Sequence, residues 1–520
     1  MSGEFTVTLG AGAPLRAAAL SHDAASLTDP ALSRWVPASG SADADLLPEL
    51  EILRSRSRHQ AANEPLAGHA VQAQVDNVVG PGLRLSAQPE YRALGRDKAW
   101  AREWAAGVES LWRTWAESTE CDAAGTLNFA GLTEQMFRAV LVNGEGLCLL
   151  LWQPERGGGF ATRLQTVESD RLSNPHGQPD TARLRGGVEI DAWGAPVAYH
   201  IERTHPGDVH LGFAWPGARE WERVPAATPW GRRRVIHLAG RERCGMSRGK
   251  PLATAVMPLF KMLGHYLRTE LKSTIVNSLV AGIIESNLPP TEVLELFGGS
   301  AENYLEARNA YRARLEGGSL LQLPVGDQLK PFIPGRPTAA FGAFCEYLLR
   351  IIAAGLHMPY ELLLMDFSKT NYSSARAALL EAWRYYLGRR RWLADYWAGQ
   401  VYLAWLEEAV DAGLVEAPGF YGNRLAYARA RWIGPGRGWI DPLKEAQAAQ
   451  LRLESGLSTL EDELAEQGRD LEETLDQREA EREMMRDRGL LAAAEASARR
   501  PVVVEPDPEE ESSGAGEEES

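Results

Sequence analysis

The chain contains two long amphipathic helical patterns that bracket a short insert of different character. In each pattern, apolar side chains recur three or four residues apart, so that they share one face of a helix. The first pattern consists of Leu252, Val256, Leu259, Leu263, Leu267, Leu271 and Ile275, with Pro258 expected to kink or restart the helix. The second begins near Thr338, places Phe341, Phe344, Leu348 and Ile352 on one face, and ends before Pro359. Two such helices bring the ends of the insert together, so we expect it at the tip of a helical stalk.

The insert and the segment after the stalk differ from the helices. Strand-like runs at 279–285, 319–323 and 328–333 and a helical run around 291–315 predict a small α/β insert. Residues 358–373 read MPYELLLMDFSKTNYS, in which proline and turn-forming residues break the helical period. A very long helical pattern rich in Trp and Tyr then covers about 374–412. We therefore expect a loop between two long helices.

The N-terminal half is predicted to be helical first and β-rich afterwards. Helical spacing extends from Leu46 to Val79, and again over 99–117 and 131–143. The aromatic residues Trp100, Trp104, Trp112 and Trp115 recur at near-helical intervals and are expected in the core. Between 145 and 240, short apolar runs alternate with turn residues and no helical pattern intervenes, which argues against a parallel dinucleotide-binding sheet.

The C-terminal part is predicted to be entirely helical, with clear start and stop signals. The starts are Asp441 with Pro442, Ser458 with Glu461, and Asp470 with Glu473; the stops are Gly456, Gly468 and Gly489. The chain ends in the acidic stretch PVVVEPDPEEESSGAGEEES, which is expected to be disordered.

About half of the formal charge of −15 lies in the last twenty residues of the chain. The acidic tail holds eight acidic residues and no basic one, which leaves −7 for residues 1–500. A tight, sequence-reading DNA binder usually has a concentrated basic face. The mildly acidic body argues against that class of protein.

Several other classes lack their sequence signals. The four cysteines lie far apart without a C-x-x-C pair, so neither a disulfide framework nor a cysteine zinc site is indicated. The histidines lack H-E-x-x-H spacing, and there is no G-x-x-x-x-G-K-[ST] for nucleotide hydrolysis. No leader pattern and no run of the ~18–20 apolar residues that span a bilayer is present. We expect a soluble, unsecreted protein with no cofactor and no membrane partner.

One motif favours an enzyme: Gly245-Met246-Ser247-Arg248-Gly249 fits the G-x-S-x-G of a serine hydrolase. In a nucleophile elbow the serine follows the strand directly, whereas residues 239–244 separate this glycine from the preceding strand. Only His265 and His357 follow the serine, and both lie in helical patterns. A turn before a helix explains the motif better, and the hydrolase is kept as an alternative.

Two cationic features are candidates for contact with phosphate. Arg389, Arg390 and Arg391 are consecutive, so they fan over about 200° of a helix, and a solvated or pairing role suits them better. Lys369 lies in the segment between two long helices with aromatic neighbours. A loop with one cation can press on a nucleic-acid backbone without reading its bases.

Several segments together resemble the lambda-type family of phage portal proteins. In the N-terminal half and middle these are Ser33-Arg34-Trp35-Val36-Pro37, Leu53-Arg54-Ser55-Arg56-Ser57-Arg58 with Asn63, Asp76-Asn77-Val78-Val79-Gly80-Pro81-Gly82-Leu83, Thr133-Glu134-Gln135-Met136, Asn143-Gly144-Glu145-Gly146 and Ser247-Arg248-Gly249-Lys250-Pro251. The C-terminal ones are residues 432–445, WIGPGRGWIDPLKE, then Gly456-Leu457-Ser458 and Gln467-Gly468-Arg469-Asp470. The resemblance is colinear over about residues 25–490, and the acidic tail has no counterpart in the family pattern.

The resemblance implies an α+β portal fold, mainly α-helical, with a β-rich wing, a small α/β clip and a ring-forming subunit. The implied divisions are a disordered arm (1–24), wing (25–247), first stem helix (248–278), clip (279–337), second stem helix (338–357), tunnel loop (358–373), long wing helix (374–412), crown (413–490) and disordered acidic tail (491–520). The implied channel residues are Asp366, Phe367, Ser368, Lys369, Thr370, Asn371 and Tyr372.

The implied function is that of a channel at one capsid vertex, in the virion and in the host cytoplasm during assembly. Twelve copies would form the ring through which double-stranded DNA is packaged and ejected, without sequence preference. The expected partners are the terminase large subunit, the major capsid or scaffolding protein, and a head-tail adaptor protein. Since the chain lacks a P-loop, a separate packaging ATPase would supply the energy, and this chain is not expected to be an enzyme. A helical scaffold that forms no channel is the remaining alternative.

Overall fold

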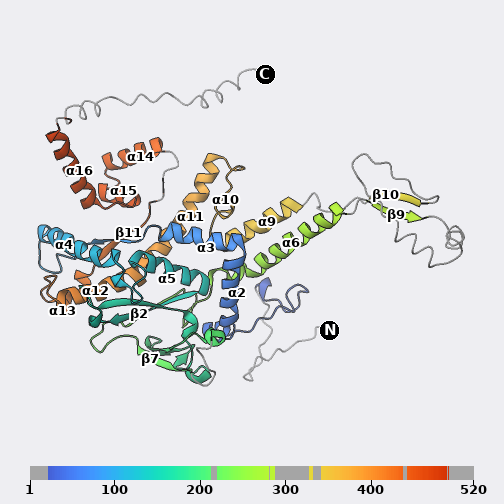
Figure 1. Ribbon diagram of the computed structural model, residues 1–520, viewed down its shortest axis with the longest axis horizontal. Helices are drawn as coiled ribbons and strands as arrows, with labels where there is room; N and C mark the ends of the chain where they lie inside the picture. Colours follow the sequence, from blue (N-terminus) through green and yellow to red (C-terminus); the bar gives the residue numbers. More distant parts are fainter. Residues whose placement is uncertain are drawn as a thin grey trace, which may run out of the picture.

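The computed structural model describes residues 22–211, 219–279, 282–286, 327–331, 341–436, 438, 442–488 and 490. These residues form an α+β fold in which a mainly helical body extends into a two-helix stalk (Figure 1). None of the described helices has the length and hydropathy of a membrane span. The predicted arm up to residue 21, the acidic tail, the helix near 291–315 and the strand at 319–323 lie outside the described residues. The predicted fold class is confirmed.

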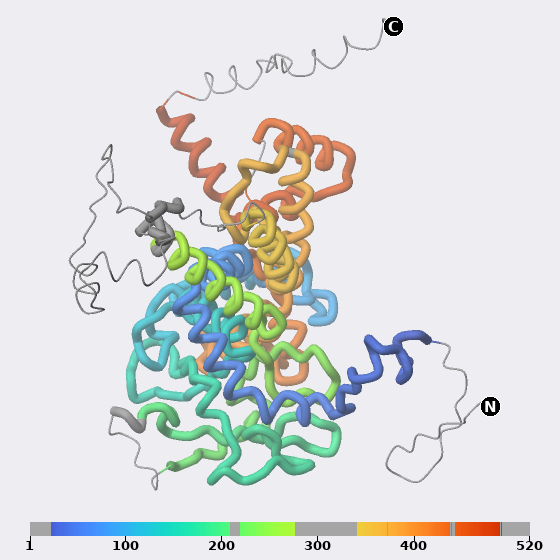
Figure 2. The backbone as a smooth tube through the Cα atoms, turned by 90° about the vertical axis from the view of Figure 1, so that its right-hand side faces the viewer, coloured from blue at the N-terminus to red at the C-terminus, as the bar shows by residue number. Residues whose placement is uncertain are grey.

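The helical pattern predicted from Leu46 to Val79 is divided into two helices, and a short additional helix precedes them. In chain order, the three are α1 (Ala42–Leu46), α2 (Leu50–Asn63) and α3 (Pro65–Val78). The break falls at Glu64, which is extended (φ −108°, ψ 112°) because the following Pro65 disfavours helical geometry in the residue before it. The chain before α1 projects away from the body (Figure 2).

The predicted tryptophan helix is α4 (Lys98–Glu117), and α5 (Phe129–Asn143) follows it. Asp97 caps α4 by accepting the Trp100 N–H at 2.8 Å, and Gly144 ends α5 in the left-handed region (φ +88°). Trp104, Trp112 and Trp115 are buried, as predicted, and Trp100 packs at the edge of the same cluster.

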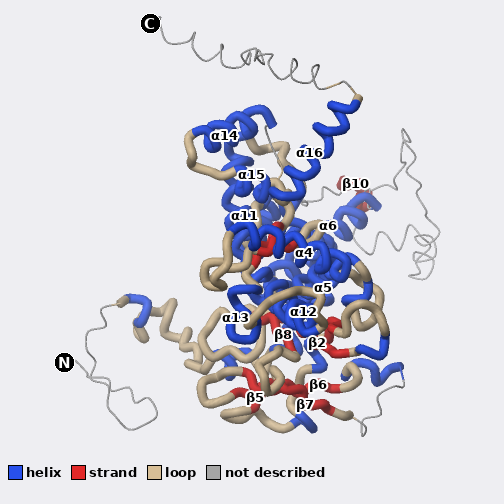
Figure 3. Tube along the Cα trace, turned by 90° about the vertical axis from the view of Figure 1, so that its left-hand side faces the viewer, coloured by secondary structure: helices blue, strands red, loops and turns tan. Residues whose placement is uncertain are grey.

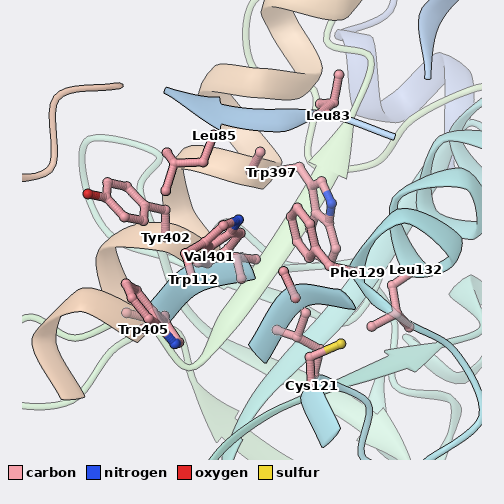
Figure 4. Packing of buried hydrophobic residues seen from close by; sticks show 14 of the residues in the cluster. Leu83, Leu85, Trp112, Cys121, Phe129, Leu132, Trp397, Val401, Tyr402 and Trp405 are labelled. Atoms are coloured by element: carbon pink, nitrogen blue, oxygen red, sulfur yellow. The ribbon is translucent and has the colours of Figure 1, made fainter. Parts of the chain in front are cut away.

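Figure 4 shows the centre of this core, where α4 and α5 meet the long C-terminal helix. Trp112 lies edge-on to Tyr402 and Trp405, with ring centroids 5.6 and 5.3 Å apart. Phe129 stacks on Trp397 at 5.9 Å with an interplanar angle of 7°. Because aromatic rings bury the largest apolar areas, this cluster is the main anchor of the body.

The β-rich segment forms two antiparallel sheets, as the absence of intervening helices predicts. One sheet has the order β3 (Thr162–Val167), β2 (Glu145–Trp152), β8 (Val235–Ala239). The other has the order β4 (Leu184–Arg185), β5 (Val188–Ile190), β6 (Pro196–Glu202), β7 (Trp221–Pro225). The strands gather on the side of the body away from the C-terminal helices (Figure 3).

The stalk consists of α6 (Met257–Leu279) and α9 (Phe341–Gly355), which pack against each other. A short 3-10 helix (Leu252–Ala255) precedes α6, so the chain restarts its helix near Pro258, as predicted. At the far end of the stalk, β9 (Gly282–Ser286) pairs with β10 (Asp327–Pro331), antiparallel, with Ile284 opposite Leu329 (Figure 1).

The segment after the stalk is only partly a loop. A short helix, α10 (Tyr360–Leu364), lies within the predicted loop 358–373, because Pro359 precedes a run of helix-forming residues. The long helical pattern is then confirmed as α11 (Tyr372–Leu393), a π-helical turn (Ala394–Ala398) and α12 (Gly399–Asp411).

The C-terminal part is not entirely helical. After α13 (Phe420–Tyr427), the strand β11 (Ala430–Ile433) pairs with β1 (Arg84–Ala87) from the N-terminal half. The helices α14 (Pro442–Glu454), α15 (Leu460–Glu466) and α16 (Leu471–Asp487) follow. Asp470 caps α16 as predicted, whereas Thr459 rather than Ser458 caps α15, accepting the Asp462 N–H at 3.2 Å. Asp441 and Gly489 lie outside the described residues.

Candidate functional site

The segment Asp366–Tyr372 forms a tight turn between α10 and α11. Met365 ends α10 in the left-handed region (φ +52°). Ser368 N–H then donates to Asp366 Oδ1 at 3.0 Å, and Asn371 Oδ1 caps α11 by accepting the Ser374 N–H at 2.8 Å. Local hydrogen bonds therefore hold the turn, which presents exposed side chains between two helices.

Lys369 is the cation of this turn, and its side chain is 75% exposed. Its Nζ lies 3.4 Å from Glu346 Oε2 on α9, and Glu346 also accepts from Arg350 at 2.8 Å. These contacts hold the pKa of Glu346 below its ordinary value, with the Arg350 hydrogen bond as the largest cause. Phe367 is exposed beside Lys369, and Thr370 Oγ1 donates to Glu361 at 3.3 Å. The turn thus brings the predicted residues 366–371 together on a surface that contacts the stalk, while the side chain of the last predicted residue, Tyr372, lies outside the described residues.

The stalk carries apolar side chains on faces that its own packing leaves open. At its base, Phe260 and Leu263 of α6 pack with Cys345 and Ile352 of α9 in a buried cluster. Further out, Leu267 and Leu271 of α6 are exposed. On α9, Phe344, Tyr347 and Ile351 are exposed at helical spacing, with Tyr347 64% exposed. An exposed apolar face of this kind is typical of a surface that contacts another protein.

A buried ion cluster connects the base of the stalk to the body. Glu145, at the start of β2, is fully buried and accepts from Arg248 Nε at 2.9 Å and Nη2 at 2.6 Å. Arg54 of α2 donates to the same carboxylate at 2.5 Å, and His237 Nε2 lies 3.0 Å from it. Arg248 also donates to the backbone carbonyls of Leu172 and Ser169. Glu145 therefore joins α2, the β3-β2-β8 sheet and the segment that leads into α6.

The electrostatics of this cluster favour the ionised form of Glu145. Burial alone would raise the pKa of Glu145, but Arg248, Arg54 and His237 hold it well below its ordinary value. Burial lowers the pKa of Arg54 to about 10, against the opposing effect of Glu145. A buried carboxylate with two guanidinium partners stays charged because each ion compensates the other's loss of solvation.

Two glycine-containing motifs from opposite ends of the chain contact each other beside the core. Arg390 of α11 is buried and donates to the backbone carbonyls of Val78 at 3.1 Å and Asn77 at 2.8 Å. A side chain at Gly434 would approach Arg390 within 2.5 Å, and one at Gly80 would approach Pro435 within 2.7 Å. Only glycine fits at these two positions without displacing a neighbour.

The arginine run 389–391 therefore has structural contacts. Arg389 donates to the Tyr385 hydroxyl at 3.1 Å, and Arg391 lies 3.8 Å from Asp395. Arg389 and the buried Arg390 therefore have pairing roles, whereas Arg391 is 86% exposed.

Ser247 does not form a nucleophile elbow. The residue is buried, and its hydroxyl donates to Asp43 Oδ2 at 2.8 Å while its backbone N–H donates to Oδ1 at 2.7 Å. The hydroxyl therefore contacts a carboxylate directly, without the histidine that a catalytic triad places between serine and acid. The motif anchors α1 to the turn before the stalk.

The histidines of the β-rich segment do not meet one another in the described chain. His200 lies 2.6 Å from Glu189, and His205 lies 3.0 Å from Glu168. Asp170, 3.9 Å from His205, has Arg58 as an ion-pair partner. The ligand atoms of Glu168, Asp170 and His205 lie close enough to surround a metal ion, a grouping that sequence spacing gave no sign of. The arginine partner makes an ion-pair network the simpler account of it.

Comparison with known proteins identifies the class. The family model described as "Phage portal protein, lambda family" matches residues 28–390. The portal protein of Escherichia phage N15 is 34% identical over 504 residues, covering 93% of this chain and 94% of its own length. Portal protein B of Escherichia phage lambda is 33% identical over 487 residues, covering 90% of each chain. A solved chain from the neck of an empty GTA particle is 16% identical, with a TM-score of 0.45, covering 82% of this chain and 92% of that one.

This chain belongs to the lambda family of phage portal proteins. The resemblance carried by its glycine and arginine motifs is confirmed, and the structure gives those motifs physical roles. Arg54, Glu145 and Arg248 come from three of the matching segments and form one buried cluster. The motifs around Gly80 and Gly434 come from two more and pack together.

Proposed function

We propose that copies of this chain assemble into a closed, dodecameric ring that serves as the DNA channel at one capsid vertex. The observation that carries this proposal is the set of exposed apolar side chains on both stalk helices: Leu267 and Leu271 of α6, and Phe344, Tyr347 and Ile351 of α9. An apolar face along two helices is stabilised when a neighbouring subunit covers it. In a closed ring, every copy would cover one neighbour and be covered by the other.

Double-stranded DNA would pass the turn Asp366–Tyr372, with Lys369 facing the bore. A duplex must slide through a channel, so sparse cations suit the lining better than a dense basic face, which would bind DNA tightly. The exposed Lys369, partly neutralised by Glu346, fits that requirement. Asp366, Ser368, Thr370 and Asn371 would shape the turn that presents it.

Three further protein partners belong to this proposal: a motor, a head-tail adaptor and a capsid or scaffolding protein. Because the sequence has no P-loop, a terminase large subunit would dock on the ring and provide the energy for packaging. After packaging, a head-tail adaptor would replace the motor. The major capsid or scaffolding protein would hold the ring at its vertex, in the virion and earlier in the host cytoplasm.

The native mass of the purified protein tests this proposal, by mass photometry with negative-stain images of the same sample. For a 57.0 kDa chain, we expect a closed ring of about a dozen copies with a central hole. Tyr347→Glu should prevent assembly, whereas Leu425→Glu, at an exposed position on α13, should assemble normally. A wild-type protein that stays monomeric or dimeric under several assembly conditions would instead support a helical scaffold.

A further inference from the structure

One face of the stalk helix α6 carries a straight row of basic side chains. Lys261, His265, Arg268 and Lys272 are spaced by four, three and four residues, so at 100° per residue they lie within about 60° of one another. All four residues are exposed. At 1.5 Å per residue the row is about 16 Å long.

This row, Lys261 to Lys272, is largely unneutralised. Arg268 lies 3.4 Å from Glu64, but its side chain is 66% exposed, so the pair is a weak one. The side chains of Lys261, His265 and Lys272 make no hydrogen bond or ion pair with the residues that the structure describes. Three cations on one helix face of an otherwise acidic chain are suited to an external partner.

The row lies on the side of the stalk away from the turn that carries Lys369. On a helical wheel it is about 160° from Leu263, which is buried against α9 and α3. α9 in turn contacts α10, and Figures 1 and 2 both show α9 between α6 and the α10–α11 region. Lys369 and the basic row therefore face opposite sides of the same two-helix stalk.

The row borders the apolar side chains that are assigned to a neighbouring subunit, but it shares no residue with them. Leu271 is about 100° from Lys272 but only about 60° from Arg268 around the axis of α6, whereas the apolar residues of α9 lie on another helix. A second copy of the chain thus already has a surface beside the row, and the DNA duplex has one on the opposite side of the stalk.

We propose that the row Lys261–Lys272 is a docking surface for an acidic protein surface outside the ring. This inference rests on the proposed function, since that function puts the Lys369 side toward the DNA. The fitting partner presents Asp or Glu side chains over about 16 Å, as one face of an acidic helix does at matching three- and four-residue spacing. Paired charges of this kind set the orientation and the salt dependence of docking.

The test compares the full-length protein with Lys261→Glu/Lys272→Glu. The matched control is Arg183→Glu/Arg233→Glu, which makes the same charge change at exposed positions of the β-rich segment. Fluorescence anisotropy measures binding of labelled poly-L-glutamate and, separately, of a duplex DNA fragment at several salt concentrations. We expect the stalk variant to bind polyglutamate about tenfold more weakly at low salt, with duplex binding no weaker than in the control.

The other outcomes separate this inference from the proposed function. Equal loss of polyglutamate binding in both variants would overturn the inference, because general charge alone would explain it. Selective loss of duplex binding would assign the row to DNA, and loss of assembly in the stalk variant would assign it to a second copy. If the wild type does not form a ring, the proposed function fails, while the polyglutamate comparison on the unassembled protein still decides whether the row binds acidic chains.

Discussion

Arg248 and Glu145 form a buried, two-pronged ion pair at the base of the stalk, with Nε–Oε1 and Nη2–Oε1 distances of 2.9 and 2.6 Å. The pair is extended by Arg54 and His237, so one carboxylate fixes three separate parts of the chain. Since α6 follows only a few residues after Arg248, this contact sets where the stalk leaves the body. A change in the carboxylate should therefore act on both stability and stalk position.

Replacing Glu145 with Gln is expected to be strongly destabilising. The amide keeps the volume but removes the charge, which leaves Arg54 and Arg248 buried without an anion, at a cost of about 3–5 kcal/mol. Chemical denaturation of the full-length protein measures the change. Glu220→Gln is the control, because its pair with Arg203 is exposed on both sides and should contribute under about 1 kcal/mol. Equal, small effects for both variants would contradict the structural role of the cluster.

The glycines of the two packed motifs predict a second stability difference. Gly80→Ala places a Cβ 2.7 Å from Pro435 at a positive φ of +53°, and Gly434→Ala places one 2.5 Å from Arg390. Each should lower the free energy of unfolding by about 1–3 kcal/mol, because backbone strain or overpacking must be accommodated. Gly388→Ala is the control: nothing lies within 4 Å of its added Cβ, so within α11 it should stabilise by about 0.5–1 kcal/mol. Thermal unfolding of the three variants measures the order of their stabilities, in which Gly388→Ala should be the most stable.

The sequence predicted those parts of the fold that depend on local pattern. The stalk helices, the tryptophan helix and the Asp470 cap follow from spacing within a few residues. The sequence does not predict β11, because the four residues Ala430–Ile433 give little local signal and the strand forms through pairing with β1 some 340 positions earlier.

For the candidate site too, the sequence predicts the local features but not the contacts between distant segments. The proline and turn-forming residues of 358–373 predict the turn that carries Lys369, since turn formation depends on local sequence. Arg54, Glu145 and Arg248 each lie in a motif noted in the sequence, but their convergence depends on tertiary packing that spacing does not encode. The basic row on α6 has clear helical spacing and could have been found by placing the charged residues, as well as the apolar ones, on the helical wheel.

The raised pKa of Glu109 on α4 predicts that the free energy of unfolding depends on pH. Glu109 lies at the contact between the body and the C-terminal helices. Its carboxylate accepts the Ala87 N–H at 2.6 Å, and it lines a cavity of about 440 Å³ with Asp470 and Glu472 from the start of α16. Burial raises the pKa of Glu109 to about 7; the nearby Asp470 and Glu472 add to the rise, while the Ala87 hydrogen bond and Arg113 oppose it.

The sign follows from proton linkage. A carboxyl group with a raised pKa binds its proton more tightly in the folded state, so its stabilising effect is full below about pH 4.5 and is lost as pH rises to about 7. Glu109→Gln mimics the protonated group and should be more stable than the wild type at pH 8, with the difference shrinking toward pH 5. Denaturation curves of both proteins across this range measure it, and parallel pH profiles would contradict the prediction.

We expect the Lys369→Ala variant to differ from the wild type in its contact with DNA but not in ring assembly. The side chain is exposed and forms an ion pair with Glu346 at 3.4 Å, so its removal should alter the free energy of unfolding by less than about 0.5 kcal/mol. If Lys369 faces the bore, a photo-crosslinker at this position should label duplex DNA in packaged particles, whereas one at His265 on the opposite side of the stalk should not. The alanine variant should leave the ring intact in negative stain, since the apolar face of the stalk is unchanged. Crosslinking of DNA from position 265 but not 369 would show that the opposite side of the stalk faces the bore. The basic row of α6, rather than Lys369, would then be the surface that contacts DNA.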